Sequence, residues 1–130
     1  MDLDDCTLVL RNNGKELFFY DHGLNDLYAL FCHQPELLGG AEVTDRIVGM
    51  GAAIILLYGG VSRVITPIIS ESALELLEQE GVWVDYEEVV PYILNRARTS
   101  LSRMEEKLRG IENPDELLEA LHEAMREELV

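Results

Sequence analysis

The spacing of apolar and polar residues changes several times along the chain, and each change marks another expected strand or helix. Two short β-rich runs, residues 7–11 and 15–20, flank Asn12-Asn13-Gly14, and an Asn-Gly pair in this setting is typical of an antiparallel hairpin. From Leu24 to Phe31 the apolar residues recur at helical spacing, which predicts a helix with one buried face. The chain is therefore expected to open with a hairpin and an amphipathic helix.

The middle of the chain alternates between expected strands and expected helices. Residues 41–48, 63–69 and 83–86 are rich in β-branched and other apolar side chains, as strands are. Between them lie a helical stretch without a polar face at residues 49–58 and an amphipathic one at residues 70–80, which ends at Gly81. This order predicts parallel strands, and with the opening hairpin it predicts a mixed sheet.

From Pro91 onward the pattern is helical, and it leads through residues 92–96 into an expected helix at residues 101–109. A final helix is expected from Asn113, where an N-cap residue precedes Pro114 and two acidic residues. This helix, residues 113–129, is expected to pack at the periphery. The 130 residues suit one domain, residues 1–130, that can bury its own core.

Charge and composition narrow the classes of partner. A formal net charge of -15 repels phosphate backbones, so we expect no nucleic-acid binding. No apolar run reaches the length of a membrane span, and the acidic N-terminus is unlike a targeting signal, so a cytoplasmic protein is expected. Cys6 and Cys32 are expected to be reduced, and Cys32-His33 to serve packing, because no second pair completes a metal site.

Eight short motifs, taken in order, resemble a known family. They are Gly39-Gly40-Ala41, Asp45-Arg46-Ile47-Val48-Gly49, Gly51-Ala52-Ala53, Gly59-Gly60-Val61, Ile69-Ser70-Glu71, Val90-Pro91-Tyr92-Ile93, Asn95-Arg96 and Met104-Glu105. Over about residues 6–125 the chain is similar to the small prokaryotic proteins of domain-of-unknown-function family 1893. The resemblance implies a cytidine-deaminase-like fold, which is a three-layer α/β/α domain with a mixed sheet, and it implies no function.

A zinc deaminase of this layout needs a His-x-Glu or Cys-x-Glu at the start of its first central helix and a Pro-Cys-x-x-Cys at the second. The corresponding positions here read Gly49-Met50-Gly51 and Ser70-Glu71-Ser72. The sequence therefore argues against zinc-dependent deamination, and we expect no cofactor. Whether the protein is an enzyme stays open.

The two central helices should begin at the carboxyl ends of neighbouring strands, where open α/β sheets bind ligands. Their free N–H groups suit a phosphate or carboxylate. The candidate ligand-binding residues are Asp45, Arg46, Gly49, Gly51, Ser70, Glu71, Ser72, Asn95 and Arg96. Structural roles are the alternative: a helix cap at Ser70, a first-turn acid at Glu71, a strand-to-helix joint at Gly49, and an ion pair or turn lock at Asp45-Arg46.

Residues 96–103 carry three arginines and three hydroxyl groups in an otherwise acidic half of the chain. They either form an anion site or pair with the nearby acids Glu87, Glu88, Glu105 and Glu106. Two functions remain: binding of a nucleotide or another phosphorylated metabolite, and non-catalytic self-association or protein interaction. The first predicts a small anionic ligand, and the second predicts a homo-oligomer or a protein partner.

Overall fold

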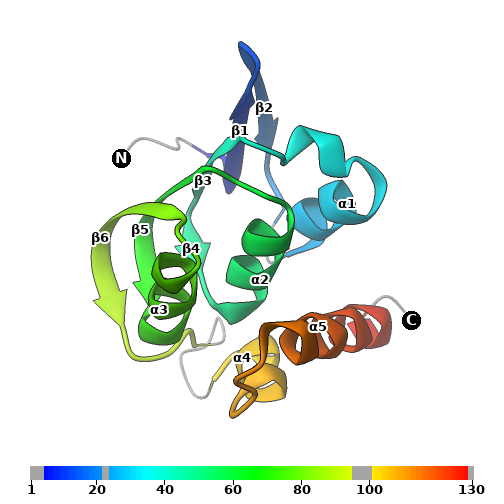
Figure 1. Cartoon of the computed structure of the whole chain (residues 1–130), viewed down its shortest axis with the longest axis vertical. Helices are drawn as coiled ribbons and strands as arrows, with labels where there is room; N and C mark the ends of the chain where they lie inside the picture. Colours follow the sequence, from blue (N-terminus) through cyan, green and yellow to red (C-terminus); the bar gives the residue numbers. More distant parts are fainter. Residues whose placement is uncertain (1–4, 22–23, 95–100, 129–130) are drawn as a thin grey trace.

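The computed structural model describes residues 5–21, 24–94 and 101–128, and the statements below concern these residues. Its elements in chain order are β1 (Leu8–Asn12), β2 (Lys15–Phe19), α1 (Asn25–His33), the 3₁₀ turn η1 (Pro35–Leu37), β3 (Glu42–Asp45), β4 (Ile47–Val48), α2 (Met50–Tyr58), β5 (Arg63–Ser70), α3 (Glu71–Gln79), β6 (Trp83–Val90), α4 (Arg103–Leu108) and α5 (Pro114–Glu128) (Figure 1). Among them, no helix combines the length and apolar character needed to cross a membrane.

Six strands form one mixed sheet. β1 pairs antiparallel with β2 and β3, whereas β5 pairs in parallel with β3, β4 and β6. The hairpin turn consists of Asn13 and Gly14, whose φ angles of 51° and 78° lie in the left-handed region that these residue types tolerate. The predicted mixed sheet with an opening antiparallel hairpin is confirmed.

The expected strand at residues 41–48 is present as two strands that are separated by Arg46. β3 and β4 pair with β5 at the same register offset, as Glu42 with Arg63 and Ile47 with Ile68 show, so they form one interrupted strand. At the interruption, the Arg46 N–H donates to the Thr7 carbonyl oxygen at 3.1 Å. The N-terminal segment thus takes the place of a strand partner at this point.

The helix expected from Pro91 is wrong for the described residues 91–94. β6 continues as a strand up to Val90, which pairs with Ser70 at the end of β5. Leu94 then forms an isolated antiparallel bridge with Leu101, and α4 begins only at Arg103. Pairing with β5 extends β6 beyond residues 83–86, where the side chains predicted a strand. Strand pairing depends on backbone hydrogen bonds, so it can continue past these residues.

The helices and the sheet form three layers. α1, α2 and α3 lie against the sheet, and α4 and α5 pack on α2 from the other side (Figure 1). α2 has no polar face because it lies between the sheet and these two helices, and residues 51–56 are all buried. The three-layer α/β class predicted from the sequence is confirmed, whereas the cytidine-deaminase-like label stays a prediction.

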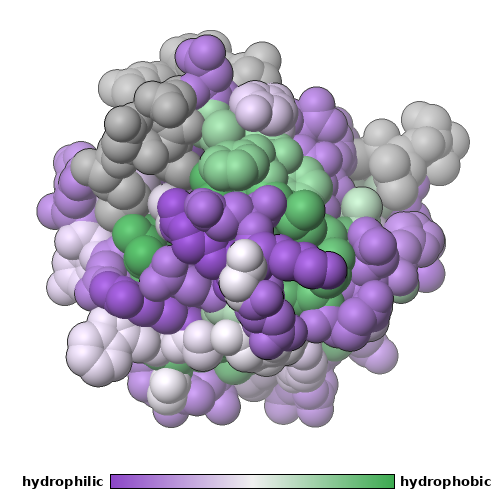
Figure 2. Space-filling model, turned by 90° about the horizontal axis from the view of Figure 1, so that it is seen from above, coloured by the Kyte–Doolittle hydropathy of each residue, from purple (hydrophilic) through white to green (hydrophobic). Residues whose placement is uncertain are grey.

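A row of charged side chains crosses the sheet on the surface that points away from the core. Four of them occupy one register row of β2, β1, β3 and β5, and the fifth extends the row on β6: Glu16, Arg11, Glu42, Arg63 and Asp85. The N–O distances between the first four are 3.0, 3.5 and 3.3 Å. The adjacent row, Leu10, Val43 and Val64, belongs to the core, as the alternation of side chains in strands requires. Hydrophilic residues also dominate the face shown in Figure 2, where apolar areas lie above and beside a hydrophilic centre.

Candidate functional site

The two helix N-termini predicted to lie side by side do so. Val48 at the end of β4 pairs with Ile69 near the end of β5, so the residues that follow, Gly49 and Ser70, lie at the same edge of the sheet. α2 begins at Met50 and α3 begins at Glu71. Both first turns therefore start at the carboxyl ends of parallel strands, which is the usual position of ligand sites in such sheets.

A carboxylate of the chain itself occupies the N-terminus of α2. The Met50 N–H donates to Oε1 of Glu105 at 3.1 Å, and Glu105 is only 8% exposed. Burial raises the pKa of the Glu105 carboxyl, and the hydrogen bond from Met50 opposes that rise. A Cβ at Gly49 would collide with this carboxylate and lie 3.0 Å from Cγ1 of Ile93. Gly49 therefore makes room for the Glu105 side chain.

The local structure of α4 explains how Glu105 becomes available to α2. Ser102 caps α4, and its Oγ accepts a hydrogen bond from the Glu105 N–H at 3.1 Å. In a reciprocal capping box the Glu side chain would return to the N–H of Ser102. Here that N–H donates to the carbonyl oxygen of Ile93 at 3.0 Å, and the Glu105 carboxylate binds α2 instead.

Sequence reasoning placed Glu105 among possible partners of the arginines and missed this contact. The Ser102-x-x-Glu105 spacing was the available signal, because it indicates a helix start with an acidic residue in its first turn. The spacing points to a cap within α4. It gives no indication that the carboxylate reaches a helix that lies fifty-five residues earlier in the chain.

Gly51 serves a second close contact between the same elements. A Cβ at this position would lie 2.6 Å from Cδ1 of Leu24 and 2.7 Å from Cγ of Met104. Met104 is the residue immediately before Glu105, so α4 approaches the first turn of α2 with two consecutive side chains. In the structure both glycines accommodate other parts of the chain.

The N-terminus of α3 is capped locally. Oγ of Ser70 accepts a hydrogen bond from the Ala73 N–H at 3.3 Å, and Ser70 is completely buried. Glu71 and Ser72 follow it in the first turn and are exposed. The structure therefore shows the structural role that the sequence offered as the alternative for Ser70.

Asp45 and Arg46 lie at the end of β3, and each contacts the backbone. Burial raises the pKa of the Asp45 carboxyl to about 7, although the backbone N–H groups of Ile47 and Arg46 hydrogen-bond to it and oppose the rise. The Arg46 guanidinium donates to the carbonyl oxygen of Cys6 at 2.7 Å. Arg46 thus ties the N-terminal segment to the sheet, in agreement with a turn lock. Asn95 and Arg96 lie outside the described residues.

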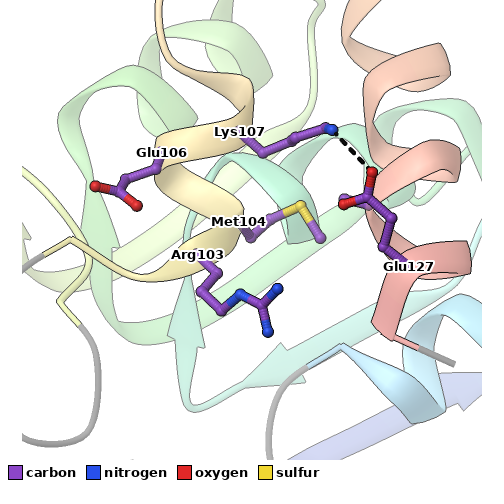
Figure 3. Close-up of a pocket in the computed structure, with 6 residues that line it drawn as sticks. Arg103, Met104, Glu106, Lys107 and Glu127 are labelled. Carbon is purple, nitrogen blue, oxygen red and sulfur yellow. Dashed lines mark hydrogen bonds and ion pairs between the residues drawn. The ribbon is translucent and has the colours of Figure 1, made fainter. Parts of the chain in front are cut away.

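An open pocket lies between α4 and α5, next to the contact of α4 with the first turn of α2. Its volume is about 290 Å³, and it is lined by Arg103, Met104, Glu106, Lys107, Ala124 and Glu127. Figure 3 shows Arg103 and Lys107 extending from α4 toward the side on which α5 lies. Nζ of Lys107 lies 3.3 Å from Oε1 of Glu127. Met104 connects the pocket to α2, because the same side chain contacts the Gly51 position.

α5 is also tied to α1 by a contact that sequence reasoning missed. The Tyr28 hydroxyl lies 2.6 Å from Nδ1 of His122, and the ring of Phe31 stacks on the His122 ring with a centroid distance of 6.1 Å. Burial is the main cause that raises the pKa of the Tyr28 hydroxyl. Tyr28 and Phe31 on α1 lie more than ninety positions before His122 on α5, so only the packing of α1 against α5 brings them together with it.

Both the sequence and the fold are similar to those of known proteins. The family model TM1506, which describes a domain of unknown function (DUF1893), matches residues 1–125. A crystal structure of a DUF1893 family protein from Thermotoga maritima superimposes with a TM-score of 0.84 at 26% identity, and the similarity covers 92% of this chain and 81% of that one. No curated protein matches the sequence. Together with the fold described above, these similarities show that the chain belongs to the DUF1893 family.

Proposed function

We propose that the protein binds a small anionic ligand, a phosphorylated metabolite, in the pocket between α4 and α5. The observation that carries this proposal is the placement of Arg103 and Lys107. These cations are four residues apart on α4, so they lie on one side of the helix, and both line the pocket. They bring two cations to a pocket that is also lined by the acids Glu106 and Glu127, in a chain whose net charge is -15.

The pocket volume limits the class of ligand. At about 290 Å³ the pocket lies at the lower end of the range of roughly 300 to 1,000 Å³ that is typical of small-molecule sites. A phosphate group with a small organic part fits this volume, whereas the base of a whole nucleotide would extend onto the surface. We therefore favour a phosphorylated metabolite over a nucleotide.

The charges in the pocket suggest how a phosphate would be accommodated. Lys107 is paired with Glu127 across the pocket at 3.3 Å, and this is an exposed type of ion pair that contributes little stability. A phosphate oxygen would replace the Glu127 carboxylate as the partner of Lys107, and the Arg103 guanidinium can bind a second oxygen. The α2 N-terminus is a poorer position for the ligand because Glu105 already accepts from Met50.

Isothermal titration calorimetry with inorganic phosphate, ribose 5-phosphate and adenosine monophosphate tests the proposal. The Arg103→Ala/Lys107→Ala variant should lose at least about tenfold in affinity for ribose 5-phosphate, because two charge-assisted contacts are removed. Lys15→Glu on the exposed hairpin changes the net charge by the same two units, so it is the matched control and should bind as the wild type does. Wild-type affinity in the double variant, with an unchanged circular dichroism spectrum, would refute the pocket as the site.

Arg96→Ala tests the contribution of the arginine-rich segment that precedes α4. Because Arg96 lies seven residues before Arg103 in the sequence, we expect its removal to lower the affinity for the same ligand. If Arg96→Ala abolishes binding while the Arg103→Ala/Lys107→Ala variant binds normally, the ligand site lies elsewhere than in the pocket. Binding that survives in both variants would remove the support for an arginine-based anion site.

A further inference from the structure

β6 forms an outer edge of the sheet. It runs for eight residues and, within the described part of the chain, β5 is the strand that pairs with it (Figure 1). An edge strand presents backbone N–H and C=O groups on its outer side, and these groups can pair with another extended chain. Proteins usually shorten or cover such edges, so an eight-residue edge calls for an explanation of what it serves.

The side chains of β6 combine aromatic and acidic groups. Trp83, Tyr86 and Val89 are 66%, 45% and 37% exposed, which is unusual for large apolar side chains within one strand. Glu88 is also exposed, and Glu87 precedes it in the sequence. The sequence between Val82 and Asn95 contains no basic residue at all. The edge therefore offers hydrogen-bonding backbone, aromatic surfaces and negative charge together.

A second copy of the chain is a poor occupant of this edge. Two β6 strands in antiparallel pairing would bring Glu87 and Glu88 of one copy close to the acidic residues of the other. Like charges on directly paired positions are destabilising, and each chain carries a net charge of -15. Acidic residues on an edge oppose pairing with an identical edge.

A basic extended segment matches all three features of the edge. Its backbone can add as a further strand beside β6, which is a common mode of peptide recognition. Lysine and arginine side chains complement Glu87 and Glu88, and their cations are attracted to the faces of Trp83 and Tyr86. We propose that the β6 edge binds an extended, Lys- or Arg-rich segment of a protein partner by strand addition.

Trp83 provides the signal for the test, because it is the one tryptophan in the chain. The full-length protein is titrated with a peptide of alternating lysine and valine while the Trp83 emission is recorded. A saturable blue shift is expected, since a bound strand removes water from the exposed indole. An alternating lysine and glycine peptide has the same charge but a low β propensity, and it should bind at least about fivefold more weakly.

Charge reversal on the edge is compared with charge reversal elsewhere. Glu88→Lys on β6 should lower the affinity for the lysine and valine peptide by about fivefold. Glu78→Lys on the exposed side of α3 should change this affinity by less than about twofold. Hydrogen exchange should also show new protection in β6 of the wild type when the peptide is bound. Circular dichroism of both variants checks that each is folded.

Three results would overturn the proposal. Equal binding of the glycine-containing peptide, or an equal loss in Glu88→Lys and Glu78→Lys, would mean that the peptide is attracted only by net charge. Sedimentation showing a dimer that buries Trp83 in the absence of peptide would mean that a second copy occupies the edge. Any one of these results would exclude strand addition by a basic segment at β6.

Discussion

The carboxylate of Glu105 caps the first turn of α2 by accepting a hydrogen bond from the Met50 N–H at 3.1 Å. The positive end of a helix favours a nearby negative charge, and in many α/β proteins a ligand anion supplies it. In this chain the acid comes from α4, and it is almost completely buried. The contact therefore holds the C-terminal helices against the edge of the sheet where a ligand would otherwise be expected.

Removing the Glu105 carboxylate should destabilise the protein. Glu105→Ala leaves the Met50 N–H without its acceptor and creates a small cavity, so we expect the free energy of unfolding to fall by about 1 to 3 kcal/mol. Glu105→Gln keeps an acceptor oxygen and should lose less. Urea denaturation at pH 7 measures both variants, and equal stability of Glu105→Ala and the wild type would show that the cap is dispensable.

An alanine at Gly51 should be unfavourable despite its helical position. Alanine is better than glycine in a helix by about 1 kcal/mol, but the new Cβ would press on Leu24 and Met104. Overpacking of this kind costs about 1 to 3 kcal/mol, so the net effect should be a loss of stability. Gly39→Ala is the control, because a Cβ at Gly39 meets no atom within 4 Å. The thermal midpoints should fall for Gly51→Ala and stay level or rise for Gly39→Ala.

Asp45 should make the protein less stable as the pH rises from about 4 to about 7. The folded-state pKa of about 7 lies above the usual value of 3.8, so the folded protein retains the proton that the unfolded chain releases in this range. The full shift corresponds to about 4 kcal/mol, and partial exposure of the side chain reduces this figure. The stabilisation by the retained proton is complete below the unfolded value and is lost as the pH passes about 7.

Replacing Asp45 by asparagine tests this dependence. The variant has no carboxyl group to ionise, so Asp45→Asn should gain stability relative to the wild type as the pH is raised from 4 to 8. The exposed Asp5 offers a matched substitution, Asp5→Asn, that should leave the pH profile unchanged. The test is the free energy of unfolding measured at several pH values. Parallel curves of this free energy against pH for Asp45→Asn and the wild type would contradict the raised pKa of Asp45.

The contact between Tyr28 and His122 should couple α1 to α5. Tyr28→Phe removes the hydroxyl that lies 2.6 Å from Nδ1 and should cost about 1 kcal/mol. His122→Ala should cost more, because it also removes the ring that stacks on Phe31. In a double-mutant cycle the two changes should be less than additive by about 0.5 to 1 kcal/mol. Additive effects would show that the hydroxyl and the imidazole do not interact in solution.

Local patterns in the sequence were sufficient for most of the elements. The Asn13-Gly14 turn, the strand at β5 and the capped starts of α3 and α5 each depend on a few neighbouring residues. The absence of a polar face between residues 49 and 58 also predicted that this helix would be covered on all sides, as α2 is. These features are local because backbone preference and side-chain period act over one or two turns.

The remaining features depend on contacts between distant parts of the chain. β6 extends to Val90 because β5 provides a partner there, and the helical pattern after Pro91 does not outweigh that pairing. Asn95 and Arg96, two of the predicted ligand-binding residues, lie outside the described residues, and their role stays a prediction.

The sequence by itself determined that two helices begin at the carboxyl edge of a mixed sheet, with glycine at the start of one and serine at the start of the other. Only the tertiary structure decided what meets those helix ends. Ser70 caps its own helix, whereas Gly49 leaves room for Glu105, which α4 brings from a distant segment. The reason is physical: a local pattern fixes the period and the caps of a helix, but the choice of partner for a free backbone group depends on packing in three dimensions.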